Sequence, residues 1–82
     1  MRKAVVLEFI ETMQEKLDEN WRKTHWKCSP FEFLFKRLMQ ETVELFEAKT
    51  IGESGRNIAR ECADIANFAM MIADNEDYSK KG

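Results

Sequence analysis

Residues 29–49 read SPFEFLFKRLMQETVELFEAK, and this stretch determines the fold that we expect. Ser29 precedes Pro30, and Glu32 stands three positions after the serine, a pattern typical of a helix start with a capping box. Apolar residues then recur at helical spacing, at Phe31, Leu34, Phe35, Leu38 and Leu45. The sequence therefore predicts a helix over residues 30–49 with one apolar face.

Two further segments show helical periodicity. The first covers residues 4–23, and its apolar positions are Val6, Ile10, Met13, Leu17 and Trp21. The second covers residues 56–74, and its apolar positions are Ile58, Cys62, Ile65, Ala69 and Ile72. Residues 50–55 contain two glycines and predict a loop, while residues 76–82 form a polar, frayed tail. We therefore expect one all-α domain over residues 1–82, an antiparallel helical hairpin plus an N-terminal helix, assembled into an oligomeric helix bundle.

The composition narrows the class of protein. Of the 82 residues, 44% are hydrophobic and 34% are charged, which indicates a folded chain. A formal net charge of −2 argues against a nucleic-acid polymer as partner, and no apolar run approaches the roughly 20 residues that cross a membrane. Cys28 and Cys62 lack paired spacing, so we expect reduced thiols in a cytoplasmic protein. So short a chain has a marginal core, which favours a homodimer or homotetramer.

Two pairs of acidic residues carry the chemistry that we expect. Glu41 and Glu44 are three positions apart, and so are Glu61 and Asp64, so that each pair shares one face of its helix. Sixteen residues separate the pairs, enough to end one helix, turn and begin the next. An antiparallel hairpin would bring the four carboxylates face to face.

Glu41 stands where an apolar residue would be expected, on the same stripe as Leu38 and Leu45. Carboxylates that converge on a partly buried seam repel one another, by about 4 kcal/mol for a pair 4 Å apart at an effective dielectric near 20. A bound divalent cation relieves this repulsion. Hard oxygen ligands favour Mg²⁺, with Mn²⁺ as an alternative. Acid pairs at this spacing also occur on solvated helix faces, and the spacing alone leaves both interpretations open.

The two acid pairs, with sixteen residues between them, resemble the signature of the MazG-like all-α nucleoside triphosphate pyrophosphohydrolase superfamily. Residues 38–45, LMQETVEL, and residues 61–68, ECADIANF, resemble its two motif helices. Residues 23–26, KTHW, resemble a Lys-x-x-Trp segment of its small members. The resemblance covers about residues 20–75. Many members carry a fourth helix after the second motif, so we expect a more open pocket or a wall supplied by the oligomer.

The resemblance implies hydrolysis of an NTP or dNTP to the monophosphate and pyrophosphate. It implies that the acidic residues bind Mg²⁺ and that one of the glutamates also orients the water. The implied catalytic and metal-binding residues are Glu41, Glu44, Glu61 and Asp64. Related all-α dUTP pyrophosphatases and phosphoribosyl-ATP pyrophosphohydrolases share these carboxylates, so the acids leave the base and the sugar open.

Three further residues are candidates for contacts with the substrate. Lys23 could meet phosphates, although lysines near helix ends are often only solvated. Trp26 could stack on a base, or it could close the edge of the core. Asn67 lies one turn beyond Asp64 and could contact sugar or phosphate, or make a capping or interhelical hydrogen bond.

Two other classes of function compete with the enzyme. One is a non-catalytic helical module that binds nucleotide or another protein. The other is an assembly protein whose acids are scattered over its surface. The position of Glu41 in an apolar stripe favours the enzyme, because a purely structural helix has no need of an acid there.

Overall fold

The computed structural model describes residues 3–19 and 26–78 of the chain. It contains three α-helices, which are α1 (Lys3–Glu19), α2 (Phe31–Thr50) and α3 (Gly55–Ala73). Two short elements flank the pair of long helices, a 3₁₀ turn η2 (Trp26–Cys28) and a π-helical turn η3 (Asp74–Tyr78). Within these residues there is no strand, which confirms the all-α prediction. None of the described helices has the length and apolar character needed to cross a membrane.

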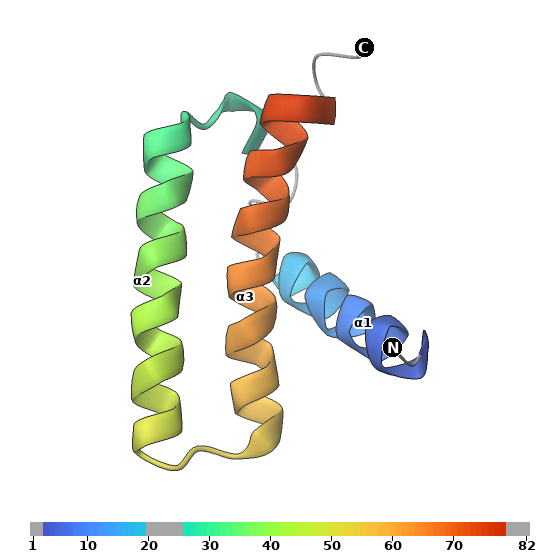
Figure 1. Cartoon of the computed structure of the whole chain (residues 1–82), viewed down its shortest axis with the longest axis vertical. Coiled ribbons are helices and arrows are strands. Elements are labelled where there is room, and N and C mark those ends of the chain that lie inside the picture. The colour runs from blue at the N-terminus through green and yellow to red at the C-terminus, as the bar shows by residue number, and fades with distance from the viewer. Residues whose placement is uncertain (1–2, 20–25, 79–82) are drawn as a thin grey trace.

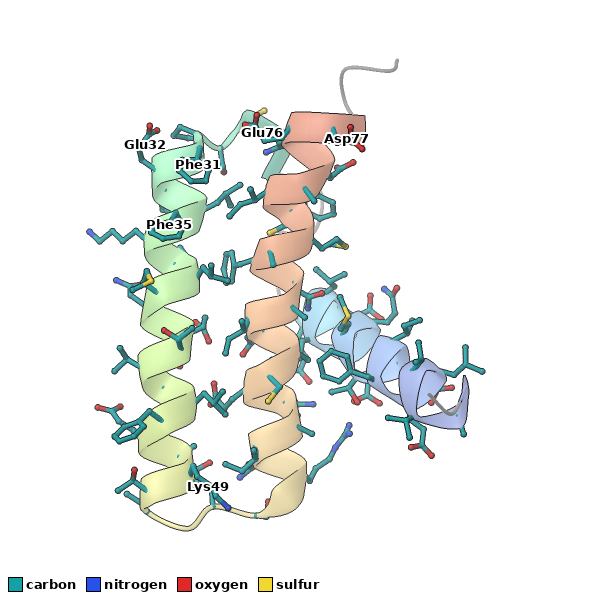
Figure 2. All side chains as sticks on the ribbon, in the orientation of Figure 1. Phe31, Glu32, Phe35, Lys49, Glu76 and Asp77 are labelled. Atoms are coloured by element: carbon teal, nitrogen blue, oxygen red, sulfur yellow. The ribbon has the colours of Figure 1, made fainter. Side chains whose placement is uncertain are left out.

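Helices α2 and α3 lie side by side and run in opposite directions, and α1 packs against a different side of α3 (Figure 1). The start of α2, marked by Phe31 and Phe35, therefore lies at the same end of the molecule as Glu76 and Asp77 (Figure 2). Lys49 marks the opposite end, where the loop joins α2 to α3 (Figure 2). This arrangement makes α3 the central helix, in contact with both of the others.

The apolar core sits between the first half of α2 and the last half of α3. Its buried members are Leu34, Phe68 and Met71. Partly buried side chains pack around them, namely Leu17, Trp26, Leu38, Met70 and Ile72. The core is small, and Phe46 on α2 remains 73% exposed.

The start of α2 differs from the predicted capping box. The N-cap is Pro30 rather than Ser29, and no side chain caps the helix. The physical reason is the preceding 3₁₀ turn, in which the backbone N–H of Ser29 donates to the carbonyl of Trp26 at 3.0 Å. The carbonyl of Pro30 then accepts from the N–H groups of Phe33 and Leu34. The helix accordingly begins one residue later than predicted, at Phe31.

The loop after α2 turns the chain with a glycine. Gly52 has a φ of 81°, a left-handed conformation that L side chains rarely adopt. The N–H of Gly52 donates to Lys49 and the N–H of Glu53 donates to Ala48, so the last carbonyls of α2 are satisfied. Ser54 then caps α3, since its hydroxyl accepts from the N–H of Asn57 at 3.1 Å. The sequence analysis predicted the loop but not this cap.

The remaining boundaries shift by a few residues. Helix α1 is described to Glu19, and the rest of the helix predicted over residues 4–23 lies outside the described residues. Residues 74–78 form a helical turn, so the first part of the predicted polar tail is ordered rather than frayed. Lys23 and residues 79–82 also lie outside the described residues.

Candidate metal centre

Three carboxylates meet at the interface of α2 and α3. Glu41 comes from the middle of α2, and Glu61 and Asp64 come from successive turns of α3. One oxygen from each lies within 4.8 Å of the others. The antiparallel packing of α2 against α3 brings the acids together (Figure 1). We call these three residues the acidic cluster.

Two oxygens of the acidic cluster are buried without a hydrogen-bond partner among the described residues. Glu41 is only 5% exposed and its Oε1 has no donor. The Oε1 of Glu61 is buried in the same way. A buried carboxylate oxygen without a donor carries a desolvation cost, so it favours a proton or a bound cation. This observation separates the cluster from a solvated acidic face.

The electrostatics of the cluster favour a cation. Burial raises the pKa of Glu41 to about 7, and the charges of Glu44 and Asp64 add to this effect. Arg37 opposes it, and Glu61 raises the pKa by a smaller amount. Burial also raises the pKa of Glu61, with Glu44 and Asp64 as the next contributors. Both carboxyl groups therefore hold protons more tightly than a solvated glutamate does, and a divalent cation would relieve the same repulsion.

Glu44 is the fourth predicted ligand, and the structure places it at the edge. Its side chain is exposed, and it is not part of the group of three oxygens that lie within 4.8 Å of one another. Its charge nevertheless acts on the pKa values of both Glu41 and Glu61. Glu44 thus borders the cluster from the solvent side.

Two positively charged side chains contact the acidic cluster, and the sequence analysis did not single out either of them. Arg37 lies one turn before Glu41 on α2, and its Nη2 is 3.4 Å from Oε2 of that glutamate. Lys16 reaches across from α1, and its Nζ is 3.4 Å from Oδ2 of Asp64. The spacing of Arg37 and Glu41 was visible in the sequence, whereas the contact of Lys16 depends on how α1 packs.

The predicted substrate-contacting residues have other contacts in the structure. The Nδ2 of Asn67 donates to the carbonyl of Met13 at 3.1 Å, and its Oδ1 is buried without a donor among the described residues. The indole N–H of Trp26 donates to Asp74 at 2.9 Å, and the ring packs against the core. Neither belongs to the acidic cluster. Lys23, as noted, falls outside the described residues.

Comparison of the chain with protein-family models, with curated proteins and with solved structures gave no match.

The donor set suits a hard divalent cation. Glu41, Glu61 and Asp64 present oxygen only, and oxygen is the ligand that Mg²⁺ prefers. Three carboxylates leave part of an octahedral shell for waters or phosphate oxygens, as magnesium sites in phosphoryl-transfer enzymes do. The unpartnered oxygens of Glu41 and Glu61 are the atoms that such an ion would satisfy.

Proposed function

We propose that the chain is a Mg²⁺-dependent nucleoside triphosphate pyrophosphohydrolase of the MazG-like all-α kind, which cleaves an NTP or dNTP to the monophosphate and pyrophosphate. The observation that carries the proposal is Glu41, 5% exposed and with an unpartnered oxygen, next to Glu61 and Asp64. The sequence resemblance is the reason for proposing this reaction, and the acidic cluster is the candidate binding site for the cation that the reaction requires.

The acids have distinct tasks in this proposal. Glu41, Glu61 and Asp64 hold the cation, which when bound neutralises charge on the triphosphate and lowers the pKa of a bound water. Glu44 is exposed beside them and is the carboxylate best placed to orient the attacking water. Arg37 shares its charge with Glu41 and is 29% exposed, so it can also face a phosphate.

Pyrophosphate release is the direct test. Purified protein is incubated with Mg²⁺ and a panel of NTPs and dNTPs, and pyrophosphate is measured against a metal-free control containing a chelator. We expect release that requires the cation and a rise in melting temperature when Mg²⁺ is added. Neither release nor a melting shift with any member of the panel would overturn the proposal.

We also propose that copies of the chain assemble through the outward face of α2. Apolar side chains follow this face at intervals of four, four, four and three residues, and they are 44% to 73% exposed. The residues are Phe31, Phe35, Met39, Val43 and Phe46. A contiguous apolar strip of this kind is typical of a protein interface, and a second copy would bury the apolar surface that the small core of one chain leaves exposed.

The mass of the protein in solution tests this assembly. Light scattering after size exclusion should give a dimer or tetramer for the wild-type chain and a smaller species for Phe46→Glu. Leu7→Glu is a matched control, since Leu7 is 59% exposed on α1 and lies off the α2 strip. An unchanged mass for Phe46→Glu together with Val43→Glu would exclude the α2 face as the interface.

A non-catalytic nucleotide-binding or protein-interaction module is the second candidate. The observation in its favour is that Lys16 and Arg37 already contact Asp64 and Glu41, so the chain itself supplies part of the countercharge. This candidate predicts Mg²⁺-dependent nucleotide binding, or no effect of Mg²⁺ at all, without any product. Pyrophosphate release separates it from the enzyme.

A further inference from the structure

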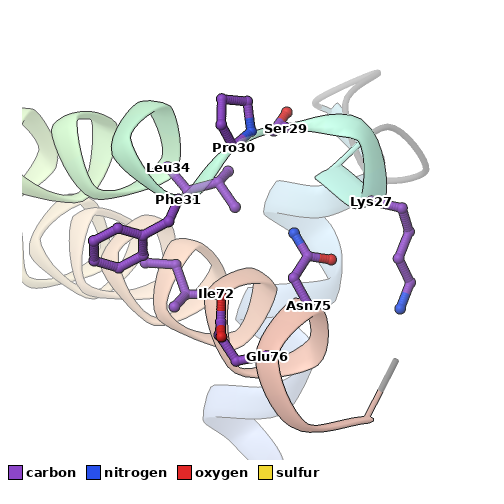
Figure 3. A pocket seen from close by; sticks show the side chains of 8 residues that line it. All are labelled: Lys27, Ser29, Pro30, Phe31, Leu34, Ile72, Asn75 and Glu76. Carbon is purple, nitrogen blue, oxygen red and sulfur yellow. The ribbon is translucent and has the colours of Figure 1, made fainter. Parts of the chain in front are cut away.

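A cavity separate from the acidic cluster opens at the other end of the core. It has a volume of about 310 Å³ and lies where the turn η2, the start of α2 and the end of α3 meet (Figure 3). Its apolar wall is formed by Phe31, Leu34 and Ile72 with Pro30. The polar residues that line the rest are Lys27, Ser29, Asn75 and Glu76. This volume is at the lower end of the range for small-molecule pockets, and polar residues make up half of the lining.

Asn75 lines the cavity and has a buried hydrogen-bond acceptor without a partner among the described residues. Its Nδ2 donates to the carbonyl of Trp26 at 2.8 Å, which fixes the orientation of the amide, since only the NH₂ group can face a carbonyl. Its Oδ1 is buried and receives no hydrogen bond from any described residue. A buried acceptor without a donor is costly and is uncommon in native proteins. Asn75 lines the cavity, and a ligand with an N–H group that reached this buried oxygen would satisfy it.

The cavity and the acidic cluster lie along one line of the helix pair. Leu34 precedes Glu41 by seven residues on α2, a rise of about 10 Å, and Ile72 follows Asp64 by eight residues on α3, about 12 Å. Because the two helices are antiparallel, both displacements point toward the same end of the molecule (Figure 1). Arg37 stands between the two places on α2.

A ligand that reaches both places has a defined chemistry. One end is polyanionic and binds the cation held by the carboxylates. The other end is flat and apolar, with an N–H group at its edge. A nucleoside triphosphate has both ends, joined by a sugar at a separation of this order.

We propose that the cavity between η2, α2 and α3 is the nucleobase site of the substrate whose phosphates lie at the acidic cluster. The base packs on Leu34 and Ile72, and an N–H group of its edge donates to Oδ1 of Asn75. The identification of the ligand as a nucleotide rests on the proposed function, whereas occupation of the cavity can be tested without turnover.

The first experiment titrates the full-length, ¹⁵N-labelled chain with AMP, GMP, CMP and UMP in the presence of Mg²⁺. Saturable shifts in the backbone resonances of Leu34, Ile72 and Asn75 are expected with at least one nucleotide. Ribose 5-phosphate is the matched probe, because it keeps the sugar and phosphate and lacks the base, and it should leave these resonances in place. No saturable shift at the cavity with any of the four nucleotides would overturn the inference.

Variants then measure the contribution of the cavity. Asn75→Leu removes the acceptor and Ile72→Trp fills the space, and each should weaken binding of the preferred nucleotide at least tenfold. Asn57→Leu is the control, since Asn57 is exposed at the far end of α3. Melting curves identify a variant that has lost its fold, and in that case the wild-type titration decides alone.

The two proposals fail in different ways. Pyrophosphate release with an unchanged KM in Asn75→Leu and Ile72→Trp would overturn the proposed nucleobase site but support the proposed enzyme activity. Shifts of the cavity resonances on addition of nucleotide, without pyrophosphate release, would support the nucleobase site and exclude the proposed enzyme activity. A rise in KM with little change in kcat for both variants supports both proposals, because the base contact contributes to binding rather than to the chemical step.

Discussion

The two interfaces of helix α3 have opposite patterns of charge. Toward α1, opposite charges pair: Arg60 donates to Glu19 at 2.5 Å, and Arg56 pairs with Glu15. Toward α2, like charges gather, with Glu61 and Asp64 facing Glu41. We call the first the paired interface and the second the acidic interface.

The ion pairs of the paired interface help to position the helices, whereas the buried acids of the acidic interface lower stability. The pair of Arg60 and Glu19 lowers the pKa of the glutamate, as an ion pair on an exposed surface does. Burial and neighbouring acids raise the pKa of Glu41 to about 7, the opposite shift. A protein keeps such a destabilising group where another purpose requires it, and this is why the acidic interface is the better candidate for function.

Removing a charge from the acidic interface should have the largest effect. Glu41→Gln and Glu61→Gln should each reduce pyrophosphate release by at least about 100-fold, since metal-assisted charge stabilisation is worth several kcal/mol. They should also abolish the melting shift with Mg²⁺. Glu11→Gln on the exposed side of α1 is the control and should retain both. Wild-type rates in both cluster variants would contradict the role of the acidic interface.

Without metal, the acidic interface should make stability fall as pH rises. Below about pH 4.5 Glu41 is protonated in both the folded and the unfolded chain, and between 4.5 and about 7 only the folded chain keeps the proton. The folded state then loses about 3 kcal/mol of relative stability across this window. Urea unfolding in chelator from pH 5 to 8 should show the decline for wild type and a flatter profile for Glu41→Gln. A wild-type profile that rises with pH would contradict the buried carboxyl.

Glu44 borders the acidic interface from the solvent side, so its charge should matter less than that of the buried acids. Glu44→Gln should weaken Mg²⁺ binding less than Glu61→Gln, by about tenfold or less, since an exposed charge is screened. If Glu44 orients the water, the same variant should lower kcat more than it changes the affinity for the ion. Calorimetric titration with Mg²⁺ and steady-state kinetics on one preparation measure the two effects. Equal losses of metal affinity in both variants would place Glu44 among the direct ligands.

The paired interface should show the smallest effect. Glu15→Gln breaks exposed ion pairs with Arg56 and Arg60, and exposed pairs contribute about 0 to 1 kcal/mol. Urea unfolding should therefore shift by no more than about 1 kcal/mol, and pyrophosphate release should stay at the wild-type rate. A large loss of activity in this variant would mean that the placement of α1 controls the acidic cluster through Lys16.

Local periodicity determined much of the fold. The helical spacing of apolar residues predicted α2 and α3 to within one residue at each end, because neighbours three and four positions apart share a face in any α-helix. The same local rule placed Glu61 and Asp64 on one face, and the apolar series around Glu41 predicted its burial, which the structure confirms. The two glycines in residues 50–55 predicted the loop that joins the helices.

Tertiary packing decided the rest. The apolar stripe predicted the burial of Glu41, but the exposure of Glu44, which leaves it outside the group of three close oxygens, depends on how α2 packs on α3. The contact of Lys16 with Asp64 and the acceptor of Asn75 in its cavity join segments far apart in the chain. Residue spacing reports which side chains share a helix face, whereas burial and partners depend on what the neighbouring helix places opposite that face.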